Sequence, residues 1–259
     1  MIMIKLKDIL LESDGGEEPL DILHPRRNKM EREKNYQIAL QKSIRDYIKN
    51  GSEGNLWLER SLIKYLPDNL KTVGGDLSLR SSKIVKLPDN LTVNGYLDLK
   101  NSEITELPEN LTVNGYLSIA LTDIQRIPES LVVKDHLYAT NLLLESFPNN
   151  LKVGGVIILD ETVFKNGLPD NLTVNTDIDL VKTNLTKLPE NLTVNGNLNI
   201  KGTQISEIPS SLVVTDTLFV HDTPLAKKLR DIYRKTKSGM MSWEIFKTLY
   251  PKINKITGI

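Results

Sequence analysis

Apolar residues recur along most of this chain with a period of about 20 residues, each time around a proline. The prolines of this series are Pro67, Pro88, Pro108, Pro128, Pro148, Pro169, Pro189 and Pro209. Counted from Pro108, the apolar positions are Leu111, Val113, Leu117, Ile119, Ile124 and Ile127, and the same offsets hold from Pro189. Self-similarity at a short fixed period is typical of proteins whose units stack into one continuous core. The pattern therefore predicts a repeat solenoid over residues 54–224.

Each unit contains one short segment in which apolar and polar residues alternate. In Tyr96-Leu97-Asp98-Leu99 both leucines point to one side and their neighbours to the other. We expect nine such strands, beginning at Leu56, Leu77, Leu97, Leu117, Leu137, Ile157, Ile178, Leu198 and Leu218. The rest of each unit contains proline and is too short for a full helix, so we expect it to be extended or polyproline-like. Two units carry one extra residue, between Leu70 and Val73 and between Phe164 and Leu168.

Two polar features recur at the turns of the unit. Dipeptides such as Asn94-Gly95 and Asn114-Gly115 precede the strand, where we expect them to adopt positive φ. A Ser or Thr column follows the strand and is interrupted at Leu142; its members are Ser61, Ser82, Ser102, Thr122, Thr162, Thr183, Thr203 and Thr223. Stacked hydroxyls are expected to satisfy buried turn amides from coil to coil.

Helical periodicity replaces the repeat at both ends. An apolar stripe closed by Asn50-Gly51 predicts an N-terminal capping helix within residues 33–53; it consists of Tyr36, Leu40, Ile44, Tyr47 and Ile48. After Pro224 a second stripe predicts a helix over 225–235, and Ser242 predicts the N-cap of another that stops before Pro251. We therefore expect a basic helical cap over 225–259 and a peptide with a polar segment over 1–32.

The unit resembles the leucine-rich repeat, specifically the short class found in secreted bacterial effectors. The matching residues are Leu-x-Leu, a polar turn residue and a closing Leu-Pro, as in LDLKNSEITELP at 97–108, and the resemblance covers residues 54–225. It implies about nine short parallel β-strands on a concave face and an extended convex side. Some effectors of that class carry a ubiquitin ligase with a cysteine nucleophile. The chain has no cysteine, so that activity is not carried over.

The first twelve residues, MIMIKLKDILLE, resemble the N-terminal capsid-targeting peptides of internal head proteins in large tailed phages. The protease site of that family, Leu-x-Glu, is matched by Leu10-Leu11-Glu12. The resemblance implies a bacteriophage protein in the virion or the host cytoplasm; the alternative is a helix that docks on this chain or on a partner. The segment lacks the long apolar run of a secretory signal. The chain contains no run of 18 apolar residues, so we expect no membrane partner.

Composition and charge exclude several kinds of functional site. The chain has 33 basic and 33 acidic residues, and the absence of cysteine excludes disulfides and thiolate metal sites. His24, His136 and His221 lie far apart in the sequence, and no phosphate loop or nucleophile–base pair stands out. We therefore predict no catalytic, metal or cofactor residues and no enzyme.

The side chains beside the strand leucines are the remaining candidate site. The predicted partner-binding residues are Trp57, Arg80, Tyr96, Asp98, Lys100, Tyr116, His136, Tyr138, Ile158, Phe219 and His221. Tyr96, Tyr116 and His136 occupy the same position in successive coils, about 4.8 Å apart. Aromatic residues with polar neighbours are typical of binding patches, although strands favour aromatic residues in any case.

The leading hypothesis is a non-catalytic module that binds another protein on this face. A virion component anchored through its two ends is the first alternative. The second is nucleic-acid binding by residues 225–259, which hold nine basic and two acidic side chains.

Overall fold

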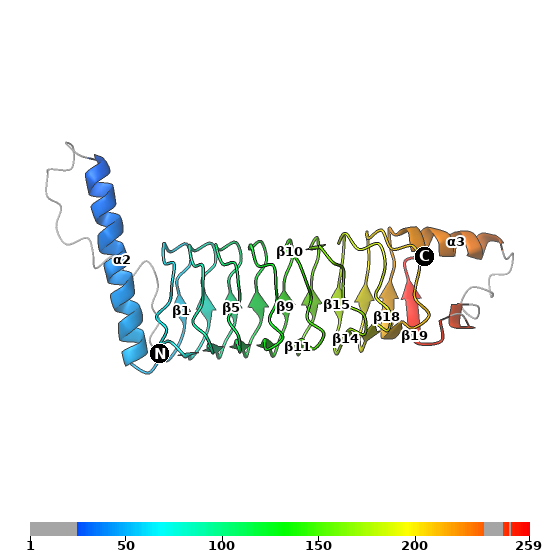
Figure 1. Cartoon of the computed structure of the whole chain (residues 1–259), viewed down its shortest axis with the longest axis horizontal. Helices are drawn as coiled ribbons and strands as arrows, with labels where there is room; N and C mark the ends of the chain where they lie inside the picture. The colour runs from blue at the N-terminus through cyan, green and yellow to red at the C-terminus, as the bar shows by residue number, and fades with distance from the viewer. Residues whose placement is uncertain (1–24, 236–245, 249) are drawn as a thin grey trace.

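The computed structural model describes residues 25–235, 246–248 and 250–259, and it shows a parallel β-solenoid of about eight turns. The coils follow one another in a row, with one helix at the N-terminal end and a shorter helix at the other (Figure 1). The predicted fold class is confirmed.

The nine predicted strands form one parallel sheet. They are β1 (Leu56–Trp57), β3 (Leu77–Ser78), β5 (Leu97–Asp98), β7 (Leu117–Ser118), β9 (Leu137–Tyr138), β12 (Ile157–Ile158), β15 (Ile178–Asp179), β17 (Leu198–Asn199) and β18 (Val213–Phe219). Equivalent residues pair, so that Leu97 lies beside Leu77 and Leu117. This register stacks the leucines into columns, and both Leu97 and Leu99 are fully buried. Each such side chain contributes about 1.5–3 kcal/mol to stability.

A second row of strands lies where the sequence predicts extended or polyproline-like chain. Five of these strands form a parallel sheet, and two more, β14 and β16, join β18. The seven strands are β2 (Thr72–Val73), β4 (Thr92–Val93), β6 (Thr112–Val113), β8 (Val132–Val133), β11 (Lys152–Val153), β14 (Thr173–Val174) and β16 (Thr193–Val194). Extended segments stacked about 4.8 Å apart satisfy their backbone groups by pairing, and no single unit shows that neighbour.

On a third side, β10 (Leu143–Leu144) pairs with β13 (Val163–Phe164).

The Asn-Gly dipeptides that precede the strands, such as Asn94-Gly95 and Asn114-Gly115, do not adopt positive φ, so that prediction is wrong. Positive φ occurs earlier in the unit, at residues such as Asn90 and Asn110, and again after the strand, as at Asn101. Gly115 serves a different purpose. A Cβ atom there would lie 2.9 Å from the carbonyl carbon of Gly95 and from the amide nitrogen of Tyr96 in the preceding coil. Glycine is therefore required because two backbones approach closely.

The hydroxyl column works mainly within a coil rather than between coils. Thr203 Oγ1 donates to the carbonyl of Ile200 at 2.8 Å, and Thr122, Thr183 and Thr223 make the equivalent bond. At the interruption, Thr162 of the next coil supplies the missing hydroxyl. Its Oγ1 donates to the carbonyl of Ala139 at 2.7 Å and accepts the amide of Leu142 at 3.3 Å.

The N-terminal cap is the helix α2 (Pro25–Lys49), which begins eight residues before the predicted start at residue 33. The polar residues 25–32 therefore continue the helix, and proline is well suited to a helix's first turn. Leu40, Ile44 and Tyr47 are buried against the first coil, as predicted. The Tyr47 hydroxyl lies 2.7 Å from the carbonyl oxygen of Ser52 and accepts the amide of Gly74 at 3.2 Å, which ties the helix to the second coil.

The C-terminal cap is only partly helical, so the prediction of a helical cap is wrong for its last residues. Helix α3 (Pro224–Lys235) is followed, beyond a helical turn at 246–248, by the strand β19 (Ile253–Thr257), which pairs in parallel with β18. Isoleucine is β-branched and favours strands, so Ile253 and Ile256 suit β19, and β18 offers it an edge of unpaired backbone groups. The last coil is thereby covered.

Ser242 and residues 1–24, including Leu10-Leu11-Glu12, lie outside the described residues. No helix in the described part of the chain is long and apolar enough to cross a membrane.

Loss of the Thr162 hydroxyl is expected to lower the free energy of unfolding more than loss of the Thr203 hydroxyl. Thr203→Val is expected to cost about 1 kcal/mol, because the carbonyl of Ile200 still accepts the amide of Thr203 at 3.2 Å. Thr162→Val is expected to cost about 2 kcal/mol or more, because the carbonyl of Ala139 and the amide of Leu142 both lose their buried partner. Urea unfolding of the two full-length variants measures the difference; an equal or larger loss for Thr203→Val would contradict it.

Candidate functional site

The outward face of the first sheet carries three columns of side chains. In the coil of β5 these columns contain Tyr96 before the strand, Asp98 within it and Lys100 after it. Because the strands pair in register, each column continues with the equivalent residue of the next coil. Neighbours in a column are about 4.8 Å apart, close enough for side chains to touch.

Three tyrosines and a histidine form one cluster on this face. The rings of Tyr96 and Tyr116 stack with their centroids 4.7 Å apart and an interplanar angle of 6°. Tyr116 meets Tyr138 edge to face at 5.7 Å, and His136 meets Tyr138 at 6.1 Å. The predicted stacking is thus present for Tyr96 and Tyr116. These four residues are called the tyrosine cluster below.

The cluster lies across the sheet and remains partly exposed. All four members are half-buried. Ser118, whose strand neighbours are Asp98 and Tyr138, is only 7% exposed although it lies on the outward side of the sheet. The larger side chains around it cover the serine. The rings are therefore held in place by the face itself rather than free in solvent.

The position before the strand normally holds a side chain that accepts a hydrogen bond from the next coil. Asp76 accepts the amide of Tyr96 at 3.1 Å, and Asp177 accepts the amide of Asn197 at 2.7 Å. His136 does the same, since its Nδ1 accepts the amide of Val156 at 2.8 Å. The neutral imidazole therefore carries its proton on Nε2, which lies 3.3 Å from the Asp135 carboxylate. Histidine in this column thus has a structural role.

Tyr96 and Tyr116 depart from that rule, as does the aliphatic Val156. A tyrosine has no acceptor atom close to its backbone, so neither residue can hold the next coil's amide as Asp76 or His136 does. The fold is served better by Asp, Asn or His at these two positions. A residue that breaks a local structural rule without an evident gain in stability is a candidate for function.

Acidic neighbours and burial set the ionisation of the cluster. Burial, followed by the nearby Tyr96, Asp98 and Asp76, raises the pKa of Tyr116 to about 12. Burial and the carboxylates of Asp76, Glu59 and Asp98 also raise the pKa of Tyr96. Both phenols are therefore neutral at physiological pH and can donate a hydrogen bond to a partner.

Charged side chains border the cluster on one side. Asp98 accepts the amide of Lys100 at 2.9 Å, and its carboxylate lies 3.8 Å from the guanidinium of Arg80. Arg80 is exposed and Lys100 is half-buried. Cationic groups are thus available beside the rings.

The remaining predicted residues are not all brought together. Ile158 pairs with Tyr138 and extends the cluster, and Trp57 lies half-buried in the first coil beside Ser78. Phe219 and His221 belong to the last coil, where Phe219 lies between Asn199 and Thr257. A Cβ on Gly258 would lie 2.4 Å from Nδ1 of His221, so His221 packs against the chain's own C-terminal segment. These two residues form no part of the tyrosine cluster.

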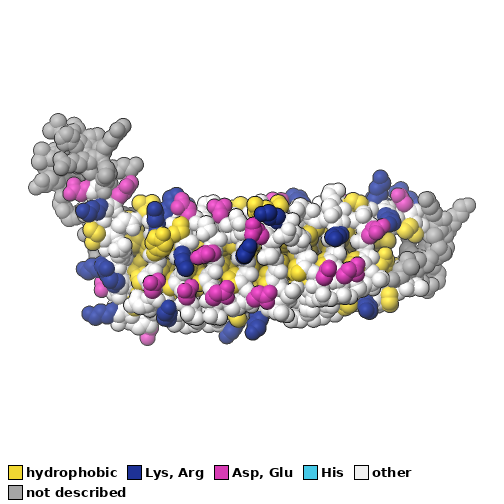
Figure 2. All heavy atoms as spheres, viewed as in Figure 1, with side chains coloured by type: hydrophobic (Ala, Val, Ile, Leu, Met, Phe, Trp, Pro, Cys, Tyr) yellow, Lys and Arg dark blue, Asp and Glu magenta, His cyan; other side chains and the backbone are white. Residues whose placement is uncertain are grey.

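Two acidic features lie outside the predicted site residues. Beyond Ile158 the face becomes acidic, and burial together with Asp179 raises the pKa of Asp160. Acidic residues also follow six of the unit prolines, and all six are exposed: Asp68, Asp89, Glu109, Glu129, Asp170 and Glu190. Figure 2 shows acidic side chains in a line along the coils. The period itself was the signal that could have revealed this line.

The described residues contain no group of three or more His, Asp or Glu side chains able to hold a metal ion. His24 lies outside them.

Comparison with known proteins adds no assignment: no family model matches the chain, and neither the curated proteins nor the solved structures contain a match.

The raised pKa of Tyr116 is directly measurable. The difference between ultraviolet pH titrations of the wild type and of Tyr116→Phe isolates this phenol, and we expect its midpoint near pH 12 rather than 10. Asp98→Asn should lower that midpoint by removing a negative charge. Because folding keeps the phenol protonated, its stabilising contribution is complete below pH 10 and is lost as the pH rises towards 12. A midpoint near 10 in the folded chain would refute this assignment.

Proposed function

We propose that this chain is a non-catalytic interaction module that binds another protein on the tyrosine cluster. One observation carries the proposal. Tyr96 and Tyr116 stand at positions where the fold uses acceptor side chains, yet the two rings stack at 4.7 Å on an outward face and stay partly exposed. Their presence is explained by recognition better than by stability.

The cluster has the physical properties of an energetic hot spot. Tyrosine offers a large apolar ring and a polar tip, and it contributes strongly to protein interfaces. Stacking against a neighbour restricts each ring before binding, which lowers the entropy lost on association. Arg80 and Lys100 supply positive charge at the rim, where they favour a partner that presents carboxylates beside an apolar surface.

The finer assignments from the sequence also remain proposals. The likeness to short leucine-rich repeats supports partner binding on the strand-bearing face, as solenoids commonly do. A bacteriophage origin, with location in the virion or the host cytoplasm, rests on residues 1–12. Detection of the chain by mass spectrometry in purified particles would support a virion role.

Site-specific photo-crosslinking tests the binding face. A photoreactive phenylalanine at position 138 should yield a partner adduct, and Tyr96→Ala with Tyr116→Ala should abolish that adduct. The matched control is Tyr65, which is 65% exposed on another side of the solenoid; the same probe there should yield none.

The affinity of each variant for the captured partner measures how much Tyr116 contributes to binding. Tyr116→Ala should weaken binding about 30-fold, equivalent to about 2 kcal/mol, whereas Tyr65→Ala should leave it unchanged. Thermal unfolding should move little, since the Tyr116 ring is only half-buried. Equal adducts from positions 138 and 65, or equal affinities of the two alanine variants, would contradict the proposal.

A further inference from the structure

The second sheet of the solenoid is interrupted between two successive coils. Strand β11 pairs only with β8, and β14 pairs only with β16. The first sheet continues across the same two coils, because Ile157 of β12 pairs with Ile178 of β15. The coils therefore remain joined on one side and are parted on another.

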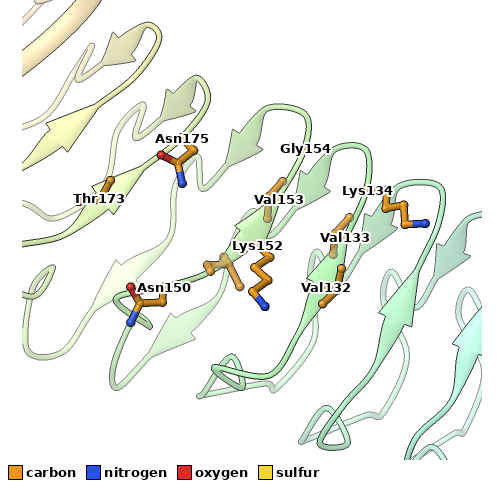
Figure 3. A pocket seen from close by; sticks show the side chains of 10 residues that line it. Val132, Val133, Lys134, Asn150, Lys152, Val153, Gly154, Thr173 and Asn175 are labelled. Carbon is orange, nitrogen blue, oxygen red and sulfur yellow. The ribbon is translucent and has the colours of Figure 1, made fainter.

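A groove of about 810 Å³ lies at this break, within the range of about 300–1,000 Å³ typical of ligand sites. Figure 3 shows Thr173 and Asn175 on one side of the opening and Lys152 and Val153 on the other. Leu151 is only partly buried, whereas its equivalents in neighbouring coils are almost fully buried. The opening thus reaches the apolar interior.

The two sides of the groove are strand edges with complementary backbone groups. In intact parts of this sheet the amide of Asn195 donates to the carbonyl of Val174 at 2.8 Å, and the amide of Thr193 donates to Leu172 at 2.9 Å. The equivalent bonds at the break would join Asn175 to Val153 and Thr173 to Leu151. No backbone hydrogen bond links residues 150–154 with residues 173–175, all of which the structure describes.

Asparagine side chains at one position of the unit bond to each other on either side of the break but not across it. Asn114 Nδ2 donates to Asn94 Oδ1 at 3.1 Å, and Asn195 Nδ2 donates to Asn175 Oδ1 at 3.0 Å. The coil before Asn175 has Gly154 at this position, which offers no side-chain acceptor. The amide group of Asn175 therefore borders the groove as a further donor.

The extra residue of this coil accounts for the break. It lies between Phe164 and Leu168, in the connection from β13 to β14, where Gly167 has a φ of +75° and no neighbouring heavy atom within 4 Å of a Cβ position. The longer connection allows β14 to lie farther from β11 than the spacing of paired strands. In these two coils the register is kept in the first sheet, where β12 pairs with β15.

We infer that this break is a strand-addition site for an extended peptide segment of a partner protein. The segment lies between β11 and β14, accepts the amides of Thr173 and Asn175, and donates to the carbonyls of Leu151 and Val153. Main-chain bonds of this kind supply affinity in β-augmentation, and side-chain pockets supply specificity. The site is separate from the tyrosine cluster and does not depend on it.

The lining of the groove indicates the chemistry of the peptide. Lys134 and Lys152 are exposed at its margin, and none of the ten residues that line it is acidic. The partly buried Leu151, next to the buried Val153, favours an apolar side chain pointing inward. We therefore commit to an extended segment with alternating apolar residues flanked by carboxylates.

A labelled peptide tests the site on the full chain. The probe is fluorescein-Glu-Asn-Leu-Thr-Val-Asn-Glu-amide, whose core copies the segment that occupies this sheet at residues 110–114 and 191–195. Saturable fluorescence anisotropy is expected. Binding should weaken at least about tenfold for a peptide with lysines in place of both glutamates, and for one N-methylated at alternate residues.

Variants of the chain locate the bound peptide. Lys134→Glu with Lys152→Glu should weaken binding at least about tenfold, while the matched exchange Lys201→Glu, at an exposed lysine outside the groove, should not. Hydrogen exchange should show new protection at residues 173–175 and none at 193–195, a readout that a nonspecific surface contact would not produce.

Four results would overturn the inference. They are absence of saturable binding, equal binding of the N-methylated peptide, loss of binding in Tyr116→Ala, and self-association of the chain that protects residues 173–175 without peptide. The third would place the peptide on the tyrosine cluster, and the fourth would assign the groove to a second copy. Failure of the crosslinking at position 138 leaves this test unaffected.

Discussion

The register in which each coil bonds to the next is the constraint on which this molecule depends. Amide-to-carbonyl bonds such as Leu97 to Tyr116, at 2.9 Å, hold equivalent residues side by side in the first sheet. Only in this register do the leucines of successive units share one dry interior. Gly115 shows how tight the stack is, because even one methyl group there would collide with the backbone of the preceding coil.

The same constraint creates surface columns, and these give the molecule its candidate sites. Side chains at the same position of successive units lie about 4.8 Å apart. Two tyrosines at such positions, Tyr96 and Tyr116, therefore stack on each other. The fold also assigns the column before the strand a structural task, which Asp76, Asp177 and His136 perform. Tyr96 and Tyr116 stand out only because that task is known from the structure.

Where the second sheet is interrupted, backbone groups of two strands are left without a partner strand. A solenoid satisfies the amides and carbonyls of its strands through neighbouring coils, and its two ends are covered here by α2 and β19. The break between β11 and β14 is an internal pair of edges without such a cover. One face thus presents side chains and another presents main-chain groups, and the two proposed sites rest on these different chemical groups.

The sequence alone determined the solenoid, its period and the nine strand positions, because leucine and proline spacing is a local property of the chain. It also placed Tyr96 and Tyr116 in one column. Four features were decided only by the tertiary structure. They are the second sheet, the hydrogen bond from the amide of Leu142 to the hydroxyl of Thr162, the strand β19 and the break beside Val153. Each of these depends on whether backbone groups find a partner at least 20 residues away, and backbone groups carry no residue-specific signal that a single unit could display.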